Sequence, residues 1–180
     1  MARSIEVRNV SANDINEKFL IDFDRYQETE DVWYINGQTK VDTRSDYFID
    51  NWSEEQKQDI SLYLRECSKN GGGVVCAMDG KKVIGFANVE KRFFGSKNQY
   101  IPLPFIHVSN AYRGEGIGRQ LFLKCCQIAK DLGAEKLYIG AHPAVETQQF
   151  YQSVGCVIAE EVNQEIYEKE PLDLQLEKKL

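Results

Sequence analysis

Apolar positions alternate with polar ones in several short stretches, and this period of two predicts strands. Residues 5–10 alternate well enough for a first strand, and residues 172–177 for a last one, in which every second residue is leucine. Residues 74–78 and 83–90 are two further apolar runs joined by an Asp-Gly pair, which is typical of a hairpin. The pattern therefore predicts a sheet in which antiparallel pairs are common.

Other segments repeat their apolar residues at helical spacing. Ser11 or Asn13 is a plausible cap for a helix that runs as far as Leu20. Ser53 and Gln56 form a capping box before a second helix, which a run of three glycines ends after residue 70. Residues 22–52 are rich in aromatic and acidic side chains and show no clean period, so their structure is left open.

A glycine-rich turn at residues 112–119 stands between a strand and a long helix. Residues 103–108 form the apolar strand, and helical spacing runs from Ile117 to Leu132 before Gly133 ends it. Glycines let the backbone approach a ligand closely, and the free amides and dipole of a helix N-terminus attract anions. The turn therefore predicts a site for a small molecule that carries phosphate.

The spacing of the turn narrows the choice of phosphate ligand. A nucleotide-binding P-loop needs Gly-Lys followed by Ser or Thr, whereas here Gly118 is followed by Arg119 and Gln120. The dinucleotide fingerprint needs glycines at positions one, three and six, whereas this turn has them at one, three and five. Both classes are disfavoured, although another nucleotide stays an alternative. The run Arg113-Gly114-Glu115-Gly116-Ile117-Gly118 instead resembles the pyrophosphate loop of the GNAT acyltransferase superfamily.

The segment after the turn strengthens this resemblance. Residues 136–140 read as a strand and residues 145–154 as a short helix ended by Gly155, and residues 150–156 are similar to a Phe-Tyr element that follows the loop in the superfamily. Two positions depart from that pattern. Ala144 stands where many members have an asparagine that contacts the pantetheine arm, and Cys156 replaces a phenylalanine.

Composition sets limits on the partners. The chain has 180 residues, a formal net charge of −6 and no basic run, which argues against nucleic acid. No apolar stretch is long enough to cross a bilayer, and the N-terminus has no signal-type segment. Five cysteines without paired spacing and two histidines give no metal motif, so we expect reduced thiols, no metal and a cytoplasmic protein.

The resemblance implies an α/β (α+β) fold with a mixed, mostly antiparallel twisted sheet flanked by helices and splayed at a central parallel strand pair. It implies one N-acetyltransferase domain over residues 1–180, with the first strand and acceptor-side helices in 1–70, the cofactor core in 74–160 and the last strand in 161–180. The implied cofactor is acetyl-coenzyme A. Its contacts would fall on Ile106, His107, Val108, Arg113, Gly114, Glu115, Gly116, Ile117, Gly118, Arg119, Thr147 and Tyr151.

The same resemblance implies the chemistry of transfer to an amine. Tyr151 would donate a proton to the departing thiolate. Glu90, at the end of a strand, and His107 are the two candidates for removing the amine proton, directly or through water. Each has a structural alternative, because Tyr151 could be a core tyrosine, His107 a buried structural histidine and Glu90 a solvated strand end. Arg113 either fixes the turn or contacts phosphate, and Arg119 offers charge to the phosphates.

The acceptor is predicted only by class. Carboxylates among aromatic side chains in residues 22–52 suit a small cationic amine, although a solvated acidic face would look the same. A protein N-terminus or lysine is an alternative acceptor. A module that binds acyl-coenzyme A without turnover is an alternative function, and the chain is expected to be a monomer or a homodimer.

Overall fold

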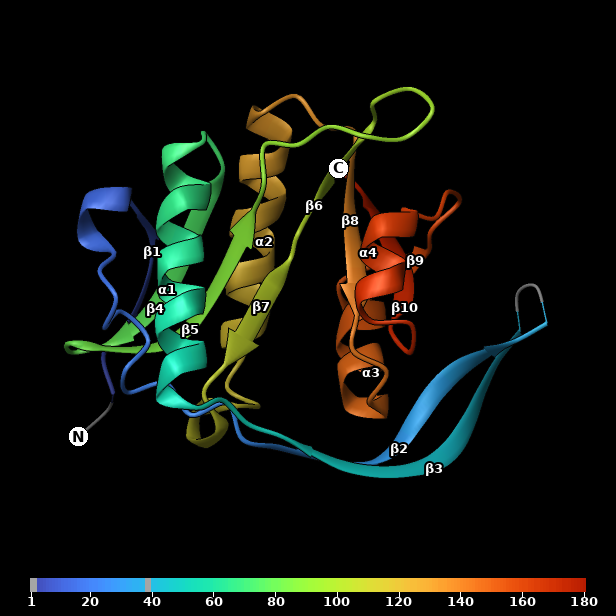
Figure 1. Ribbon diagram of the computed structural model, residues 1–180, viewed down its shortest axis with the longest axis horizontal. Coiled ribbons are helices and arrows are strands. Elements are labelled where there is room, and N and C mark those ends of the chain that lie inside the picture. Colours follow the sequence, from blue (N-terminus) through green and yellow to red (C-terminus); the bar gives the residue numbers. More distant parts are fainter. Residues whose placement is uncertain (1–2, 38–39) are drawn as a thin grey trace.

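The computed structural model describes residues 3–37 and 40–180 (Figure 1). In these ranges the strands form two four-stranded sheets and a separate two-stranded hairpin. The first sheet has the order β1-β4-β5-β7, with β1 (Ile5–Val10), β4 (Gly73–Asp79), β5 (Lys82–Val89) and β7 (Phe105–Val108). The second has the order β6-β8-β10-β9, with β6 (Tyr100–Pro102), β8 (Lys136–Ala141), β10 (Leu174–Lys179) and β9 (Val157–Ile158).

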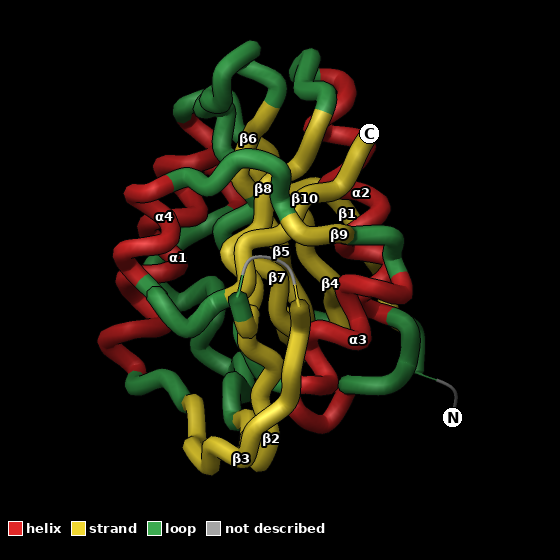
Figure 2. Tube along the Cα trace, turned by 90° about the vertical axis from the view of Figure 1, so that its right-hand side faces the viewer, coloured by secondary structure: helices red, strands yellow, loops and turns green. Residues whose placement is uncertain are grey.

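Helices cover both faces of the strands. Figure 2 shows α1 (Glu54–Lys69) and α4 (Gln164–Lys169) on one side, and α2 (Ile117–Asp131) and α3 (Val145–Ser153) on the other. On the α2 side, Leu121 and Phe122 are fully buried against the first sheet, and on the α1 side Leu64 lies in a cluster with Phe86. In the described ranges no helix is long and apolar enough to cross a membrane.

One extended segment, residues 100–108, belongs to both sheets. Its first part, β6, pairs in parallel with β8 as far as Pro102 and Tyr138, and the Leu103 amide then donates to the Tyr138 carbonyl at 2.9 Å. After Pro104 its second part, β7, pairs with β5 and leaves β8. The neighbouring strands β7 and β8 therefore diverge (Figure 1). This arrangement confirms the predicted mixed, mostly antiparallel sheet that splays at a parallel pair.

Local signals located several elements correctly. Ser53 accepts a hydrogen bond from the Gln56 amide at 3.2 Å, and the Gln56 side chain accepts one from the Ser53 amide at 2.9 Å, which makes the predicted capping box at α1. The Asp-Gly pair joins β4 to β5. The helix after the glycine-rich turn begins at Ile117, as expected.

The helix predicted over residues 11–20 is wrong. The structure has only a short 3₁₀ helix, Ala12–Asp14, followed by separate turns whose amides bond to carbonyls three residues back. Polar side chains compete with a continuous helix here, because Asn16 accepts from the Lys18 amide at 2.9 Å and Ser11 donates to Asp14 at 3.0 Å. Buried Leu20 and Phe23 hold these turns against the core.

Within residues 22–52, whose structure the sequence pattern left open, two long strands pair as antiparallel neighbours. The strands are β2 (Gln27–Asn36) and β3 (Lys40–Asp50), and this hairpin extends beneath α3 and away from the sheets (Figure 1). The Trp33 amide donates to the Pro143 carbonyl at 2.8 Å and so ties β2 to the loop after β8. The pair Asn36-Gly37, with Gly37 at φ +77°, is a turn signal in the sequence after β2. Helix α4 was not predicted.

Ser53→Ala tests the cap that fixes the start of α1. We expect a loss of about 1 kcal/mol in the free energy of unfolding, since the Gln56 amide loses the hydroxyl that accepts its hydrogen bond. For a chain of this size that corresponds to a melting temperature lower by roughly 2–4 °C in a thermal scan. Ser53→Asn is the control, because its side chain can still accept from the helix. An equal loss in both variants would contradict the capping interpretation.

Candidate active site

A cavity of about 850 Å³ opens where β7 and β8 diverge. Its wall combines the glycine-rich turn, one face of α3, the end of β3 and the loops that follow β8 and α4. Its volume lies in the range of small-molecule sites. The residues of the predicted cofactor set reach this wall, except that Glu115 is exposed and pairs with Arg3 at 3.2 Å.

The turn at the base of α2 is built to face an anion. Gly114 and Gly116 adopt φ values of +82° and +78°, which side chains rarely allow, and a β-carbon at either would meet only open space. Gly116 is the N-cap of α2, and no side chain caps this helix. The first amides of α2 therefore keep their hydrogen-bonding capacity and, with the helix dipole, favour a negatively charged ligand.

Arg113 fixes the shape of this turn. Its Nε donates to the Val108 carbonyl at 2.9 Å, and its guanidinium also donates to the Arg25 carbonyl at 3.2 Å. Burial lowers the pKa of Arg113, although nearby Asp24 opposes that shift. Arg119 donates to the Ser153 carbonyl at 3.3 Å, so it connects α2 to the end of α3 beside the cavity.

Strand β7 presents main-chain groups to the cavity. The Ser109 amide donates to the Ile84 carbonyl at 2.8 Å, and in an antiparallel ladder such bonded pairs alternate with unbonded ones. The bonded pair next to it is Phe86 with His107. The main-chain N–H groups of Ile106 and Val108 therefore point away from β5, toward the gap that β8 has left.

Tyr151 lies on α3 with its side chain in the cavity wall. It is 5% exposed, and its ring contacts Phe150 edge-on at a centroid distance of 5.3 Å. Burial raises the pKa of Tyr151, with a smaller contribution from nearby Cys156 and Asp173, so the phenol is neutral at pH 7. Thr147, one helical turn earlier, lines the same wall.

His107 lies on the opposite face of β7 from Ile106 and Val108, as its alternation predicted. Its ring contacts Trp52 edge-on at 5.1 Å and packs against Phe86, while it also borders the cavity. Burial holds the pKa of His107 well below its usual value, and the Arg25 charge lowers it further. The imidazole is therefore neutral and resists protonation.

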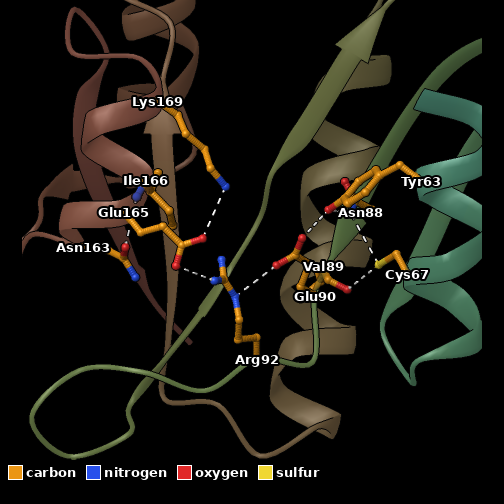
Figure 3. A network of polar contacts seen from close by, with 10 residues as sticks. All are labelled: Tyr63, Cys67, Asn88, Val89, Glu90, Arg92, Asn163, Glu165, Ile166 and Lys169. Carbon is orange, nitrogen blue, oxygen red and sulfur yellow. Dashed lines mark hydrogen bonds and ion pairs between the residues drawn. The ribbon is translucent and has the colours of Figure 1, made fainter. Parts of the chain in front are cut away.

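Glu90 lies outside the cavity wall. Its carboxylate accepts from the Tyr63 hydroxyl on α1 and pairs with Arg92 at 3.3 Å, and Arg92 in turn pairs with Glu165 on α4 at 3.1 Å (Figure 3). This network connects the end of β5 to α1 and α4. The structure thus brings Tyr151 and His107 to one cavity and gives Glu90 a position in a separate polar network.

Three further residues belong to this site. Arg25 is 4% exposed and lies 3.8 Å from Asp50, which in turn lies 2.8 Å from Nε2 of His142. Because Nδ1 of His142 accepts the Ala144 amide at 3.2 Å, Nε2 carries the proton and donates to Asp50. Burial lowers the pKa of His142 in spite of Asp50, which keeps the ring neutral. These partners are far apart in sequence, so no local pattern indicated them.

Carboxylates gather at the end of the cavity away from the glycine-rich turn. Asp50 ends β3, and Glu170 and Asp173 lie between α4 and β10. Aromatic side chains of Phe48 and Trp52 border the same region. Sequence alternation placed Asp173 on the polar side of a strand, but the structure places it in the cavity wall.

Comparisons with known proteins agree with this geometry. A family model described as "Acetyltransferase (GNAT) family" matches residues 38–156. A comparison with curated protein sequences finds no match.

Solved structures share the fold at low sequence identity. A protein of Bacillus anthracis str. Ames assigned as a streptothricin acetyltransferase, in complex with acetyl coenzyme A, has 18% identity and a TM-score of 0.74 over 98% of this chain and 99% of its own. A nourseothricin acetyltransferase has 14% identity and a TM-score of 0.69 over 97% and 98%. The PaiA N-acetyltransferase of Thermoplasma acidophilum, in complex with coenzyme A, has 17% identity and a TM-score of 0.58 over 98% and 99%.

Gly116→Ala tests the turn as an anion site. The added β-carbon strains a residue at φ +78° and stands where a phosphate would approach, so we expect affinity for coenzyme A to fall by at least tenfold in calorimetric titration. Gly133→Ala is the control, because Gly133 has a similar φ of +95° at the other end of α2. It should lose comparable stability and keep its affinity. Equal affinities in the two variants would contradict the assignment.

Proposed function

Because the chain belongs to the acetyltransferase (GNAT) family, as its turn motif predicted, we propose that it transfers the acetyl group of acetyl-coenzyme A to a primary amine of a small molecule. The predictions of an acetyltransferase and of acetyl-coenzyme A as cosubstrate are confirmed by the family match and by neighbours solved with acetyl-coenzyme A or coenzyme A. The nature of the acceptor and a direct attack in a ternary complex are the parts that we propose.

The observation that carries the acceptor proposal is the opposite character of the two ends of the cavity. The helix N-terminus at Gly116 offers amides to an anion, whereas Asp50, Glu170 and Asp173 border the far end beside Trp52. Carboxylates and aromatic faces attract an ammonium group through ion pairing and cation–π interaction. Two structural neighbours are named for streptothricin and nourseothricin, which supports a small molecule as acceptor.

Main-chain amides of the cavity wall would bind the cosubstrate at several points along its length. The amides between Gly114 and Arg119 would hold its diphosphate. The free N–H groups of Ile106 and Val108 would bond to the extended arm as a neighbouring strand does. The Val108 amide is then available to stabilise negative charge on the thioester oxygen, and one donor of this kind contributes a factor of about 10² to 10³ in rate.

The side chains of the cavity wall support direct attack. None of the five cysteines, all of which are free, belongs to the cavity wall, so no thiol there is placed to carry the acetyl group. The amine nitrogen forms a bond to the thioester carbon, the carbon–sulfur bond breaks, and nitrogen loses two protons overall. One proton ends on the sulfur of coenzyme A and the other goes to solvent. Tyr151, which is neutral, donates to the departing sulfur.

A panel of acceptors tests the substrate class. Wild-type protein is incubated with acetyl-coenzyme A and polyamines, amino acids, aminoglycosides, streptothricin, nourseothricin or peptides, and the released thiol is measured. We expect release with at least one small amine. Exclusive acetylation of peptide N-termini or lysines would overturn the small-molecule proposal and favour a protein acceptor.

Initial-rate kinetics test the order of events. When both substrates are varied, a ternary complex gives double-reciprocal lines that intersect, whereas an acetylated enzyme gives parallel lines. We expect intersecting lines. Isolation of an acetylated protein that transfers its group to the amine would contradict direct attack.

Tyr151→Phe tests the proton donor. Removal of the hydroxyl should lower kcat on the order of 10²-fold and leave affinity for coenzyme A unchanged, because the ring still packs against Phe150. Tyr138→Phe is the control, since Tyr138 is equally buried but bonds to Gln175 outside the cavity. It should lower stability and keep kcat. A Tyr151 variant with full turnover would leave only a packing role for this tyrosine.

A further inference from the structure

The group that removes the amine proton is open, because the structure disfavours the obvious candidates. Glu90 accepts from Tyr63 and pairs with Arg92 outside the cavity wall. His107 lies among aromatic rings, where burial opposes protonation. His142 has both ring nitrogens occupied, one by the Ala144 amide and one by Asp50, so it has no free lone pair.

Asp173 lies beside the gap between the two sheets. It immediately precedes β10, whose Leu174 pairs with Ala141 of β8, so the same register places it opposite His142. A β-carbon built on Gly140 would come within 4.0 Å of its Oδ2 atom and within 3.0 Å of Ile166 on α4. The carboxylate therefore occupies the α4 face of β8, whereas Tyr151 belongs to α3 on the other face (Figure 2).

Asp173 differs from the other carboxylates of the wall in having no partner. Asp50 is engaged by His142 and Arg25. Glu146 and Glu170 are exposed, so water surrounds them. Asp173 is partly buried, and its hydrogen bonds to other described residues involve only its main-chain amide and carbonyl, not its carboxylate. A partly desolvated carboxylate without a partner is suited to a cation that arrives with the substrate.

A second cavity meets the first at this residue. It has a volume of about 600 Å³ and lies between β2 and the segment that carries α4 and the start of β10. Pro143, Leu172 and Asp173 border both cavities. Toward the hairpin, the second cavity is lined by Trp33 and Tyr34 of β2. No residue of the glycine-rich turn lines it. An acceptor could thus reach the gap from the side opposite to the cosubstrate.

We propose that Asp173 binds the ammonium group of the acceptor at this junction and removes its proton before attack. The inference rests on the proposed transfer to an amine and adds a catalytic residue to it. Acceptor and donor then approach the gap from opposite faces of β8, with Asp173 on one face and Tyr151 on the other.

The protons balance in this sequence. An alkylamine with a pKa of about 10 is charged at pH 7, and Asp173 takes one proton from it and passes that proton to water. The neutral nitrogen attacks the thioester carbon. When the carbon–sulfur bond breaks, Tyr151 donates its hydroxyl proton to the leaving sulfur. The second proton of the nitrogen then moves through water to Tyr151 and restores its hydroxyl.

The electrostatics of Asp173 agree with this role. Burial, followed by the charges of Glu170 and Asp50, raises its pKa to about 7, near the value that suits a base at neutral pH. The groups that face it from neighbouring elements are Glu170 after α4, Asp50 on β3, neutral His142, neutral Tyr151, and Arg25, whose charge is paired with Asp50.

Asp173→Asn tests the proposal with the best acceptor of the panel. We expect kcat/KM for the amine to fall by at least 10²-fold and the rise of kcat through pH 7 to disappear, while affinity for coenzyme A stays as in the wild type. Asp131→Asn, at the exposed end of α2, should retain both activity and pH profile. Wild-type kcat/KM and an unchanged pH profile in the Asp173→Asn variant would overturn the proposal.

A stability measurement separates an active-site role from damage to the fold. The pKa of Asp173 is higher in the folded state than in the unfolded one, so its ionisation destabilises the protein as pH rises from about 4 through 7. Asp173→Asn removes this ionisation. We expect its melting temperature to match the wild type near pH 4 and to exceed it at pH 8. A variant that is less stable at pH 8 would place Asp173 in a supporting structural role.

Chemical rescue gives a third readout. In Asp173→Ala the missing carboxylate leaves space beside the cavity, and added formate should restore part of the lost turnover while chloride should not. Absence of rescue together with normal turnover of Asp173→Asn would overturn the assignment. If the wild-type protein acetylates no amine in the panel, the proposed function itself is overturned. If the wild type is active and the Asp173→Asn variant is equally active, only the role of Asp173 is overturned.

Discussion

The main chain of residues 100–108 pairs with one neighbouring strand in its first half and with another in its second half. Strand β6 pairs with β8, whereas β7 pairs with β5. No hydrogen-bonded ladder therefore forms between β7 and β8, and two amides of β7 remain free for a ligand. Pro104 lies at the change of partner and has no amide to offer either sheet. Every functional feature described above borders the resulting gap, including the glycine-rich turn, Tyr151 and the carboxylates.

The gap separates two electrostatic environments. The turn end has a helix N-terminus and no side-chain cap, which favours anions, while Arg113 and Arg119 are engaged with main-chain carbonyls. The far end has a buried cation, Arg25, held by Asp50, and a neutral His142. These bonds keep the charges of the far end in fixed positions.

The sequence predicted those parts whose signals are local. The turn at residues 112–119, the start of α2 at Ile117 and the capping box at Ser53 each depend on residues within a few positions of one another. Tyr151 and the cosubstrate followed from a motif of the same kind. The strands Gln27–Asn36 and Lys40–Asp50 were not predicted because few of their side chains are buried, so no alternation of apolar and polar residues marks them. Arg25, Asp50, His142 and Asp173 come together only through the packing of β3, β8 and β10, which no spacing in the chain records.

Arg113 connects two separate parts of the molecule through the main-chain carbonyls that accept its hydrogen bonds. One belongs to Val108, at the end of the strand that faces the ligand, and the other to Arg25, at the root of the hairpin. A displacement of the hairpin root therefore alters the position of the guanidinium and, with it, the geometry of the turn that begins at Gly114. By reciprocity, whatever rigidifies the turn also rigidifies the root of the hairpin. The root of the hairpin and the glycine-rich turn are thus mechanically linked through one arginine.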